Sequence, residues 1–337
     1  MTAKVRIFAS AQELLDALIR ETRPSNGFHT HSPFLFRGQA LSSWNLHPAS
    51  FRESGTDWIN RWVLTRAPDA EKRGLLLKPY VETASRRIAE QKIASDFFVR
   101  CERLGLPVPN ISQQAHRTVS LYSDFPLRYP KLNKLEWPSR ELYPVFAHAQ
   151  HYGIPTRLLD WTTDPLAAAF FSAESALHES NVNADSRITI WRILAYGVSA
   201  GDWFLQRVRT TQNDHKFGCD LVSVPQYGNE NLRAQKGLFT INRMDLDASD
   251  TLEEIYPKIR PLISADTSPD LQNEPIKTKL FDPFEIIRYE LPHSEIRALL
   301  KQLRVRNYSP AELFPDRYGV KRAIELEVEI PFDSSDQ

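Results

Sequence analysis

The pattern of apolar and polar positions changes three times within residues 146–173, near the middle of the chain. In the residues leading up to Gly153, apolar side chains recur at helical spacing, and Ser139 is placed to cap that helix. Glycine takes a left-handed conformation at low cost, and Pro155 disfavours helix at the residue before it. The pattern therefore predicts a helix that ends at Gly153 and continues as an extended chain.

Residues 156–161 are too few for a helix and lie between two prolines, so we expect a short strand or extended segment there. Asp164 followed by Pro165 predicts the start of a second helix, because proline at the first helical position gives up only a donor that has no partner. The helix predicted over 165–177 is apolar nearly all round and should be buried.

The rest of the chain alternates between strand and helix patterns, which favours an α+β body. Residues 56–137 are mostly helical in pattern, and we interpret them as an insertion or cap. Helices are also expected after Ser10, over 294–303 and after Ser309. Strands are expected at 5–8, 33–39, 188–194, 220–224 and 284–291, with a further strand opening at Gly237.

Charge and cysteine content exclude several classes of protein. The chain carries 42 basic and 42 acidic residues, so no overall field attracts nucleic acid or an anionic membrane. Two cysteines without CxxC spacing argue against a disulfide framework or a zinc site, and they favour a reducing compartment. No apolar run has the length of a membrane span, and the first residues lack the run of a signal peptide. We therefore expect a cytoplasmic protein without a membrane partner.

Several standard motifs are missing from the sequence: GxGxxG, GxxxxGK[ST], GxSxG and HExxH. His148 and His151 have a spacing that can hold a metal, but no clear third ligand accompanies them, and satisfied histidines at a helix end explain them as well. Asp160 and Asp164 have the residue types of a glycosidase pair, yet Asp164 is also explained as a helix cap. We expect no metal.

Polar groups are crowded between the two apolar helices, and burying them unpaired would be costly. They must pair with one another or face a pocket. Arg37 ends an apolar strand and precedes glycine, an arrangement that suits an anionic or carbonyl ligand and equally suits a buried structural ion pair. The crowded residues are His148, Gln150, His151, Thr156, Arg157, Asp160, Trp161 and Thr162.

Four groups of residues together resemble the FRG-domain family, which is named for its Phe-Arg-Gly motif. The resemblance spans roughly residues 28–325, and the family occurs widely in bacteria and their mobile elements. The groups are Phe36-Arg37-Gly38-Gln39 with Trp44, Pro48 and Phe51-Arg52; AQHYGIPTRLLDWTTDPLAAAFFSA at 149–173; Arg233-Ala234-Gln235 with Gly237, Phe239 and Thr240; and Leu313-Phe314-Pro315.

The resemblance implies a link to ADP-ribosyltransferase-like folds, which bind NAD in the cleft of a split β-sheet. By that analogy Arg37 holds NAD, and either Tyr152 or Trp161 packs on the nicotinamide. Gln235 lies about where those enzymes have a glutamate, but an amide supplies no negative charge to the transition state. Glu230 or Asp160 would have to replace that carboxylate, or the site only binds.

The combined expectation is one domain over residues 1–337, with a core at about 28–325 and a helical insertion at about 56–137. Its fold is α+β, with a split or mixed β-sheet core flanked by helices. The leading function is NAD-dependent ADP-ribosyl transfer or NAD cleavage, in bacterial defence or toxin action. The alternatives are a module that binds a nucleotide or modified peptide without turnover, and then an RNA-processing enzyme.

The expected site combines catalytic and binding residues in one cleft. Arg37, Arg157, Asp160 and Gln235 should share that cleft. Side chains alternate along a strand, so Arg157 and Asp160 should point to opposite faces. One should then face the cleft while the other anchors a neighbouring element, with Asp160 holding Arg37 or capping a helix. The catalytic residues are Arg37, Asp160 and Gln235, and the substrate-binding residues are Gln39, Gln150, His151, Tyr152, Thr156, Arg157, Trp161, Thr162 and Phe239.

Overall fold

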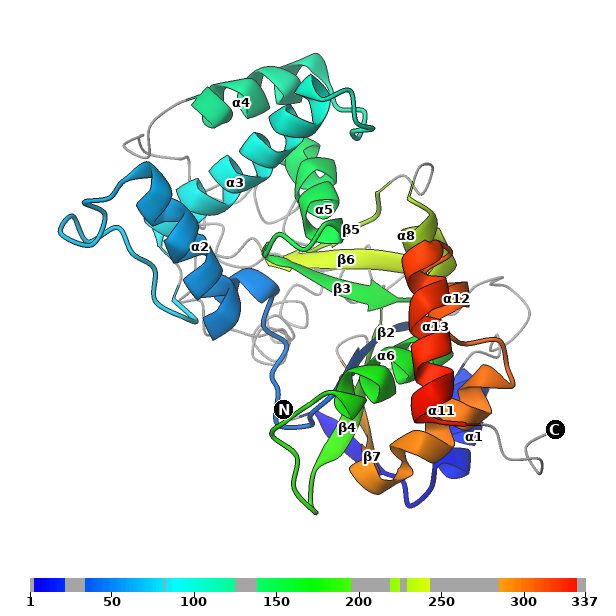
Figure 1. The fold of residues 1–337 in the computed structure, drawn as a ribbon. Helices are drawn as coiled ribbons and strands as arrows, with labels where there is room; N and C mark the ends of the chain where they lie inside the picture. The colour runs from blue at the N-terminus through cyan, green and yellow to red at the C-terminus, as the bar shows by residue number, and fades with distance from the viewer. Residues whose placement is uncertain are drawn as a thin grey trace, which may run out of the picture.

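The computed structural model describes residues 3–21, 34–81, 83–124, 138–194, 219–224, 229–242 and 285–331. A mixed seven-stranded sheet lies at its centre, in the order β1-β7-β4-β2-β3-β6-β5. β1 and β7 are parallel, and the other neighbouring strands are antiparallel. Helices flank the sheet (Figure 1), so the predicted α+β fold is confirmed. The strands are β1 (Lys4–Ile7), β2 (Phe34–Gln39), β3 (Leu158–Thr162), β4 (Arg187–Leu194), β5 (Cys219–Val222), β6 (Gly237–Asn242) and β7 (Ile287–Pro292).

The sheet divides between β2 and β3. These two strands are in register only at Phe36 and Thr162. On its other side β2 pairs with β4 along its whole length, and β3 likewise pairs with β6. The backbone groups that follow Phe36 and precede Thr162 therefore have no strand partner across the division, and they open a gap that side chains can enter.

Three helices cover one face of the first half of the sheet: α1 (Ala11–Glu21), α6 (Pro165–Leu177) and α11 (Ile296–Arg304). Their apolar faces and the strands form the largest core cluster. α6 packs so closely on β2 that a Cβ at Gly38 would lie 2.0 Å from the carbonyl oxygen of Ala168. The glycine after Arg37 is therefore required by the close approach of two backbones.

The second half of the sheet is covered by α5 (Tyr143–His151), which packs on α3 (Ala84–Arg103), and α3 in turn contacts α4 (Gln113–Asp124). α2 (Glu53–Arg66) also packs on α3. α2, α3 and α4 occupy the part of the sequence expected to form a helical insertion, up to residue 124, whereas α5 follows it; residues 125–137 lie outside the described range. The single-domain boundary remains a prediction.

The two helices around β3 begin differently. Ser139 makes no side-chain cap, which corrects the expectation; a 3-10 turn (Arg140–Leu142) comes first, and α5 starts at Tyr143 with Pro144 in its first turn. Gly153 has the predicted left-handed conformation, with φ of +82°. Asp164 caps α6 as predicted, because its Oδ1 accepts from the backbone N–H groups of Leu166 and Ala167.

The C-terminal region packs beside the pocket side of the sheet. A short helix, α8 (Glu230–Ala234), precedes β6, and α12 (Pro310–Leu313) follows α11 with Ser309 as its cap.

The last helix, α13 (Arg317–Glu329), was not predicted from the sequence. Asp316 caps it by accepting from the N–H of Gly319 at 2.7 Å. Across the ranges that the structure describes, none of the helices has the length and apolarity of a membrane span.

Candidate functional site

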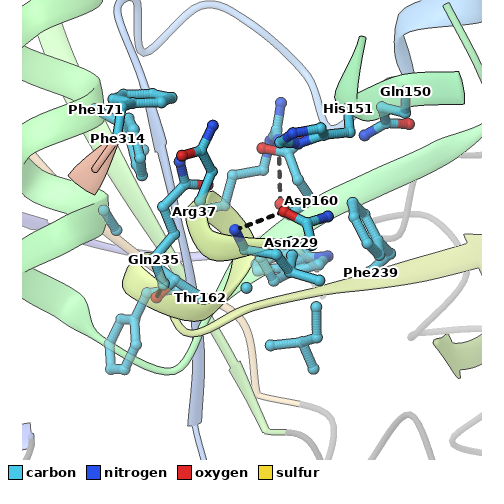
Figure 2. Close-up of a pocket in the computed structure, with 18 residues that line it drawn as sticks. Arg37, Gln150, His151, Asp160, Thr162, Phe171, Asn229, Gln235, Phe239 and Phe314 are labelled. Atoms are coloured by element: carbon cyan, nitrogen blue, oxygen red, sulfur yellow. Dashed lines mark hydrogen bonds and ion pairs between the residues drawn. The ribbon is translucent and has the colours of Figure 1, made fainter. Parts of the chain in front are cut away.

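A pocket of about 340 Å³ lies at the division of the sheet (Figure 2). β2, β3 and the start of β6 supply its floor. The end of α5, the first two turns of α6, the α8 turn and the segment after α12 supply its walls. The lining residues are Phe36, Arg37, Gly38, Gln150, His151, Asp160, Trp161, Thr162, Ala168, Phe171, Asn229, Asn231, Leu232, Gln235, Gly237, Leu238, Phe239 and Phe314.

An ion pair between Arg37 and Asp160 crosses the gap between β2 and β3 (Figure 2). The Nη1 of Arg37 lies 2.7 Å from Oδ1 of Asp160 and donates to the backbone carbonyl of the same residue at 2.9 Å. The arginine side chain is 9 % exposed, whereas the aspartate side chain is 64 % exposed. One partner is thus fixed in the protein, and the other faces solvent in the pocket.

Asp160 is ionised at neutral pH. Removal of water from around the carboxylate works against the charge, but the charge and hydrogen bond of Arg37, its own backbone N–H and the charge of Arg52 together hold the pKa of Asp160 below its usual value. The side chain is therefore suited to stabilise positive charge rather than to donate a proton.

Arg52 is a second cation near this pair, and the sequence analysis did not include it among the site residues. Its Nε donates to the carbonyl of His47 at 2.9 Å. Burial and the neighbouring charge of Arg37 lower the pKa of Arg52 to about 10, so it remains charged at neutral pH. Two guanidiniums and one carboxylate leave this cluster with a net positive charge, which favours an anionic ligand.

Gln235 connects three parts of the pocket wall. Its Nε2 donates to the carbonyl of Leu313 at 3.1 Å, and its own backbone carbonyl accepts from Oγ1 of Thr162 at 2.7 Å. Gln235 thereby links the end of α12, through its side chain, to β3, through its backbone carbonyl. In the same turn Asn229 caps α8, accepting from the N–H of Leu232 at 3.0 Å.

Aromatic rings form one end of the pocket (Figure 2). Phe171 of α6 and Phe314 after α12 meet edge to face, with ring centroids 5.9 Å apart. Arg322 of α13 lies 4.7 Å from the centroid of Phe314 and forms an ion pair with Glu174 of α6. This support fixes the ring of Phe314 against α6.

Gln150 and His151 form the opposite end of the pocket, at the end of α5. Gln150 accepts a hydrogen bond from Oγ1 of Thr156. Loss of water around the imidazole lowers the pKa of His151, although Asp316 acts in the opposite direction. The ring of His151 is therefore mainly neutral at pH 7 and can accept or donate a hydrogen bond.

Four of the predicted site residues do not line this pocket. Gln39 is buried, accepts from the indole N–H of Trp191 at 2.7 Å and donates to the carbonyl of Asn45 at 3.2 Å. Thr156 is also buried, and Tyr152 is 63 % exposed beside the ring of Phe97. The fourth residue is Arg157.

Arg157 corrects the expectation that it shares the cleft with Arg37. Its Nε lies 2.6 Å from Oε2 of Glu90 in α3, and both side chains are buried. The expected opposition of Arg157 and Asp160 is confirmed, because the first anchors a helix while the second faces the pocket and holds Arg37. The other expected members of the cleft, Arg37, Asp160 and Gln235, do meet there.

Five predicted binding residues do line the pocket: Gln150, His151, Trp161, Thr162 and Phe239. Trp161 is 3 % exposed and donates to Oγ1 of Thr240 at 2.9 Å, so little of its ring is free to stack on a ligand. Phe171, Asn229, Asn231 and Phe314 also line the pocket but were not predicted. Phe171 looked like core because its helix is apolar all round; Phe314 was part of the resemblance but carried no assigned role.

Among the described residues, no three His, Cys, Asp or Glu side chains are grouped so that they could hold an ion. His148 and His151 instead contact the ring of Tyr152, with centroids 5.2 and 5.0 Å away.

Comparison with known proteins gives one result. Searches of curated proteins and of solved structures returned no match. The family model described as the FRG domain matches residues 32–181. That range includes Arg37 and Asp160, whereas Gln235 and Phe314 lie beyond it. The pair at the floor of the pocket thus belongs to the matched region, and the chain contains an FRG domain.

Proposed function

We propose that the pocket binds a nucleotide of the NAD type and breaks the bond between nicotinamide and ribose, followed by ADP-ribosyl transfer or hydrolysis. The observation that carries this proposal is the Arg37–Asp160 pair, which joins a nearly buried guanidinium to an exposed carboxylate in the gap between β2 and β3. A pocket of about 340 Å³ lies within the range typical of small-molecule sites.

Charge supports an anionic ligand at the floor of the pocket. Arg37 and Arg52 together exceed the single carboxylate of Asp160, and a guanidinium fork matches the geometry of phosphate oxygens. The pyrophosphate of a dinucleotide supplies those oxygens. In this proposal the phosphate reaches Arg37 from the solvent-filled pocket, into which the side chain of Asp160 is also exposed.

The aromatic end supports a planar ring in the ligand. Phe171 and Phe314 present ring surface to the pocket, and Arg322 holds Phe314 in place. Offset or edge-to-face contact with a base or nicotinamide ring stabilises binding in such a site. Phe171 and Phe314 therefore take the aromatic role that the family resemblance had assigned to Tyr152 or Trp161.

Asp160 fits the chemistry of glycosidic cleavage. When the bond between the ribose carbon and the nicotinamide nitrogen breaks, its electron pair goes to the nicotinamide ring and positive charge develops on the ribose. An ionised carboxylate stabilises that charge, and water or an acceptor nucleophile then captures the ribose carbon. His151, neutral at pH 7, is placed in the same pocket to accept the proton of the nucleophile.

A second candidate, binding without turnover, is favoured by a specific observation. Among the described lining residues Asp160 is the one carboxylate, and it is already paired with Arg37. A catalytic site of this class needs negative charge that is free to face the ribose. If the ion pair between Arg37 and Asp160 stays closed while the ligand is bound, the pocket binds the nucleotide without cleaving it.

The test is to measure nicotinamide release and NAD affinity for the parent protein and for Asp160→Asn. Asparagine has the same shape without the charge. In an enzyme, turnover should fall by roughly a hundredfold or more while binding persists. In a binding module, Arg37 loses its partner and anion affinity should rise.

A matched control is Asp69→Asn, which removes the carboxylate of a surface pair with Arg73 far along the chain from the pocket residues. It should change neither quantity. If the parent neither binds NAD nor releases nicotinamide, the proposal is wrong. Binding without release would replace it by the second candidate.

A further inference from the structure

An apolar ridge is exposed on α13. Val320, Ile324 and Val328 are spaced four residues apart and are 52 %, 58 % and 77 % exposed. The packed side of this helix is different, since Gly319 and Leu326 are buried there. A Cβ at Gly319 would lie 1.9 Å from the carbonyl oxygen of Phe314, so that side is already in close contact. Among the described residues, the ridge therefore lies apart from the side by which α13 packs on its own chain.

Charges on α13 are divided between its two halves. The N-terminal half carries the cations Arg317, Lys321 and Arg322, and the C-terminal half carries the anions Glu325, Glu327 and Glu329. Lys321 and Glu325 are both exposed beside the ridge and lie 2.6 Å apart. A second copy of the helix in the same direction would place like charges together. In the opposite direction, cations would meet anions.

We propose that α13 is a self-association helix that pairs with α13 of a second copy of this chain in antiparallel orientation. Ile324 then lies on the two-fold axis and meets its own counterpart. Val320 faces Val328 of the partner subunit, and Lys321 faces Glu325 of the partner subunit. Ridges of residues four apart interdigitate in the commonest packing class of helices, and the same patch serves both copies, as two-fold symmetry requires.

The size of the ridge sets the expected strength. Three apolar side chains and a few exposed charge pairs bury less area than a stable dimer interface, so the dimer should be weak and concentration-dependent. This inference stands on α13 alone and does not rest on nucleotide binding.

Sedimentation velocity of the full chain over low to high micromolar concentrations tests the proposal. The parent should shift from monomer to dimer. Ile324→Glu places two like charges on the two-fold axis and should raise the dimer dissociation constant by roughly a hundredfold or more. Leu121→Glu is the matched control, because Leu121 is an apolar helix residue of α4 with a similar exposure of 56 %. It should dimerise like the parent.

Charge reversal tests the orientation. Lys321→Glu alone and Glu325→Lys alone should each weaken the dimer by about tenfold, because each changes two symmetric contacts. The double variant restores complementarity and should dimerise nearly as well as the parent. All four substitutions lie on exposed positions, and thermal melting verifies that each variant folds. A parent that stays monomeric throughout, or a dimer that survives Ile324→Glu, overturns the proposal.

Discussion

Two arginine–carboxylate pairs lie at β3, one just before the strand and one at its middle, and they differ in their access to water. Arg157, just before the strand, pairs with Glu90 of α3, and the two side chains are 6 % and 0 % exposed. Arg37 pairs with Asp160 within the strand, where the carboxylate is 64 % exposed. The same chemical groups therefore meet at nearly the same distance, 2.6 and 2.7 Å, in two environments.

The difference decides what each pair can do. A buried pair has no water to replace a lost partner, so it fastens α3 to the chain before β3 and must stay closed. A pair with an exposed carboxylate loses little when it opens, since water or a ligand takes the vacant place. Residues three positions apart thus place one carboxylate pair inside the protein and leave the other open to the pocket.

The largest effect is expected from Glu90→Gln. Removing the negative charge breaks the buried ion pair with the guanidinium of Arg157, which should lower the free energy of unfolding by about 3–5 kcal/mol. Urea denaturation measures this value. Asp160→Asn provides the control and should change stability by about 1 kcal/mol or less, because the carboxylate is 64 % exposed and Arg37 keeps its hydrogen bond to the backbone carbonyl of residue 160. Equal losses in both variants would contradict the distinction between the pairs.

The sequence predicted most of the elements around these pairs because local rules determine them. Asp164 with Pro165 starts α6, and Gly153 ends α5, through backbone geometry that neighbouring residues impose. Ser139 does not cap α5 because Pro144 is tolerated only in the first turn of a helix. The regular helix therefore begins at Tyr143, four residues after Ser139. The sequence analysis did not predict α13, because apolar residues occur both on its exposed ridge and on its buried side. The sequence therefore lacks the single apolar stripe that marks an amphipathic helix.

The next largest effect concerns Arg37. Arg37→Lys should weaken NAD or ADP-ribose binding almost as much as Arg37→Ala, by roughly tenfold to a hundredfold, because an ammonium cannot replace a fixed fork of donors. Calorimetric titration measures the affinity. Arg73→Lys, in the surface pair with Asp69, is a matched control that should bind like the parent. Full binding by Arg37→Lys would show that only the charge matters.

A smaller change is expected from Arg52→Gln. Arg52 does not line the pocket but adds positive charge beside Arg37 and Asp160. Its removal should weaken anion binding by about two- to fivefold and reduce the dependence of affinity on salt. Titration with ADP-ribose at low and high ionic strength measures both. An unchanged salt dependence would place Arg52 outside the field of the pocket, with only its hydrogen bond to His47 as a role.

The site was harder to predict than the fold. The alternation expected along the extended segment 156–161 predicted that Arg157 and Asp160 face apart, but it gave no means to choose which one meets the pocket. Glu90 holds Arg157 away from the pocket, and it lies in α3, far from Arg157 in sequence. No sequence motif marked Glu90 as the partner of Arg157. Phe314 and Asn229 come together with Arg37 only through tertiary packing, so no local pattern could group them.

The smallest expected effect is a pH dependence of stability that arises from His148. This residue lies where α5 packs on α3, the helix that also holds Arg157. His148 of α5 lies 5.3 Å from the ring of Phe97, and its Nε2 is buried with no hydrogen-bond partner among the described residues. Burial, and then the neighbouring His151, lower the pKa of His148 below its usual value of 6.5. In the part of the chain that the structure describes, no carboxylate contributes to this shift, whereas Arg157 is paired with Glu90.

The sign of the pH dependence follows from this shift. Below pH 6.5 the unfolded chain binds a proton at His148 before the folded chain does, so stability should fall as the pH drops from 6.5 toward the folded pKa. Above pH 6.5 both states are neutral there, and the contribution is constant. Urea denaturation of the parent and of His148→Gln between about pH 7.5 and pH 5.5 measures the difference. The variant should lose less stability on acidification than the parent. Parallel pH profiles would mean that the folded protein protonates His148 without cost, and that the interface of α5 with α3 admits water where the Arg157–Glu90 pair does not.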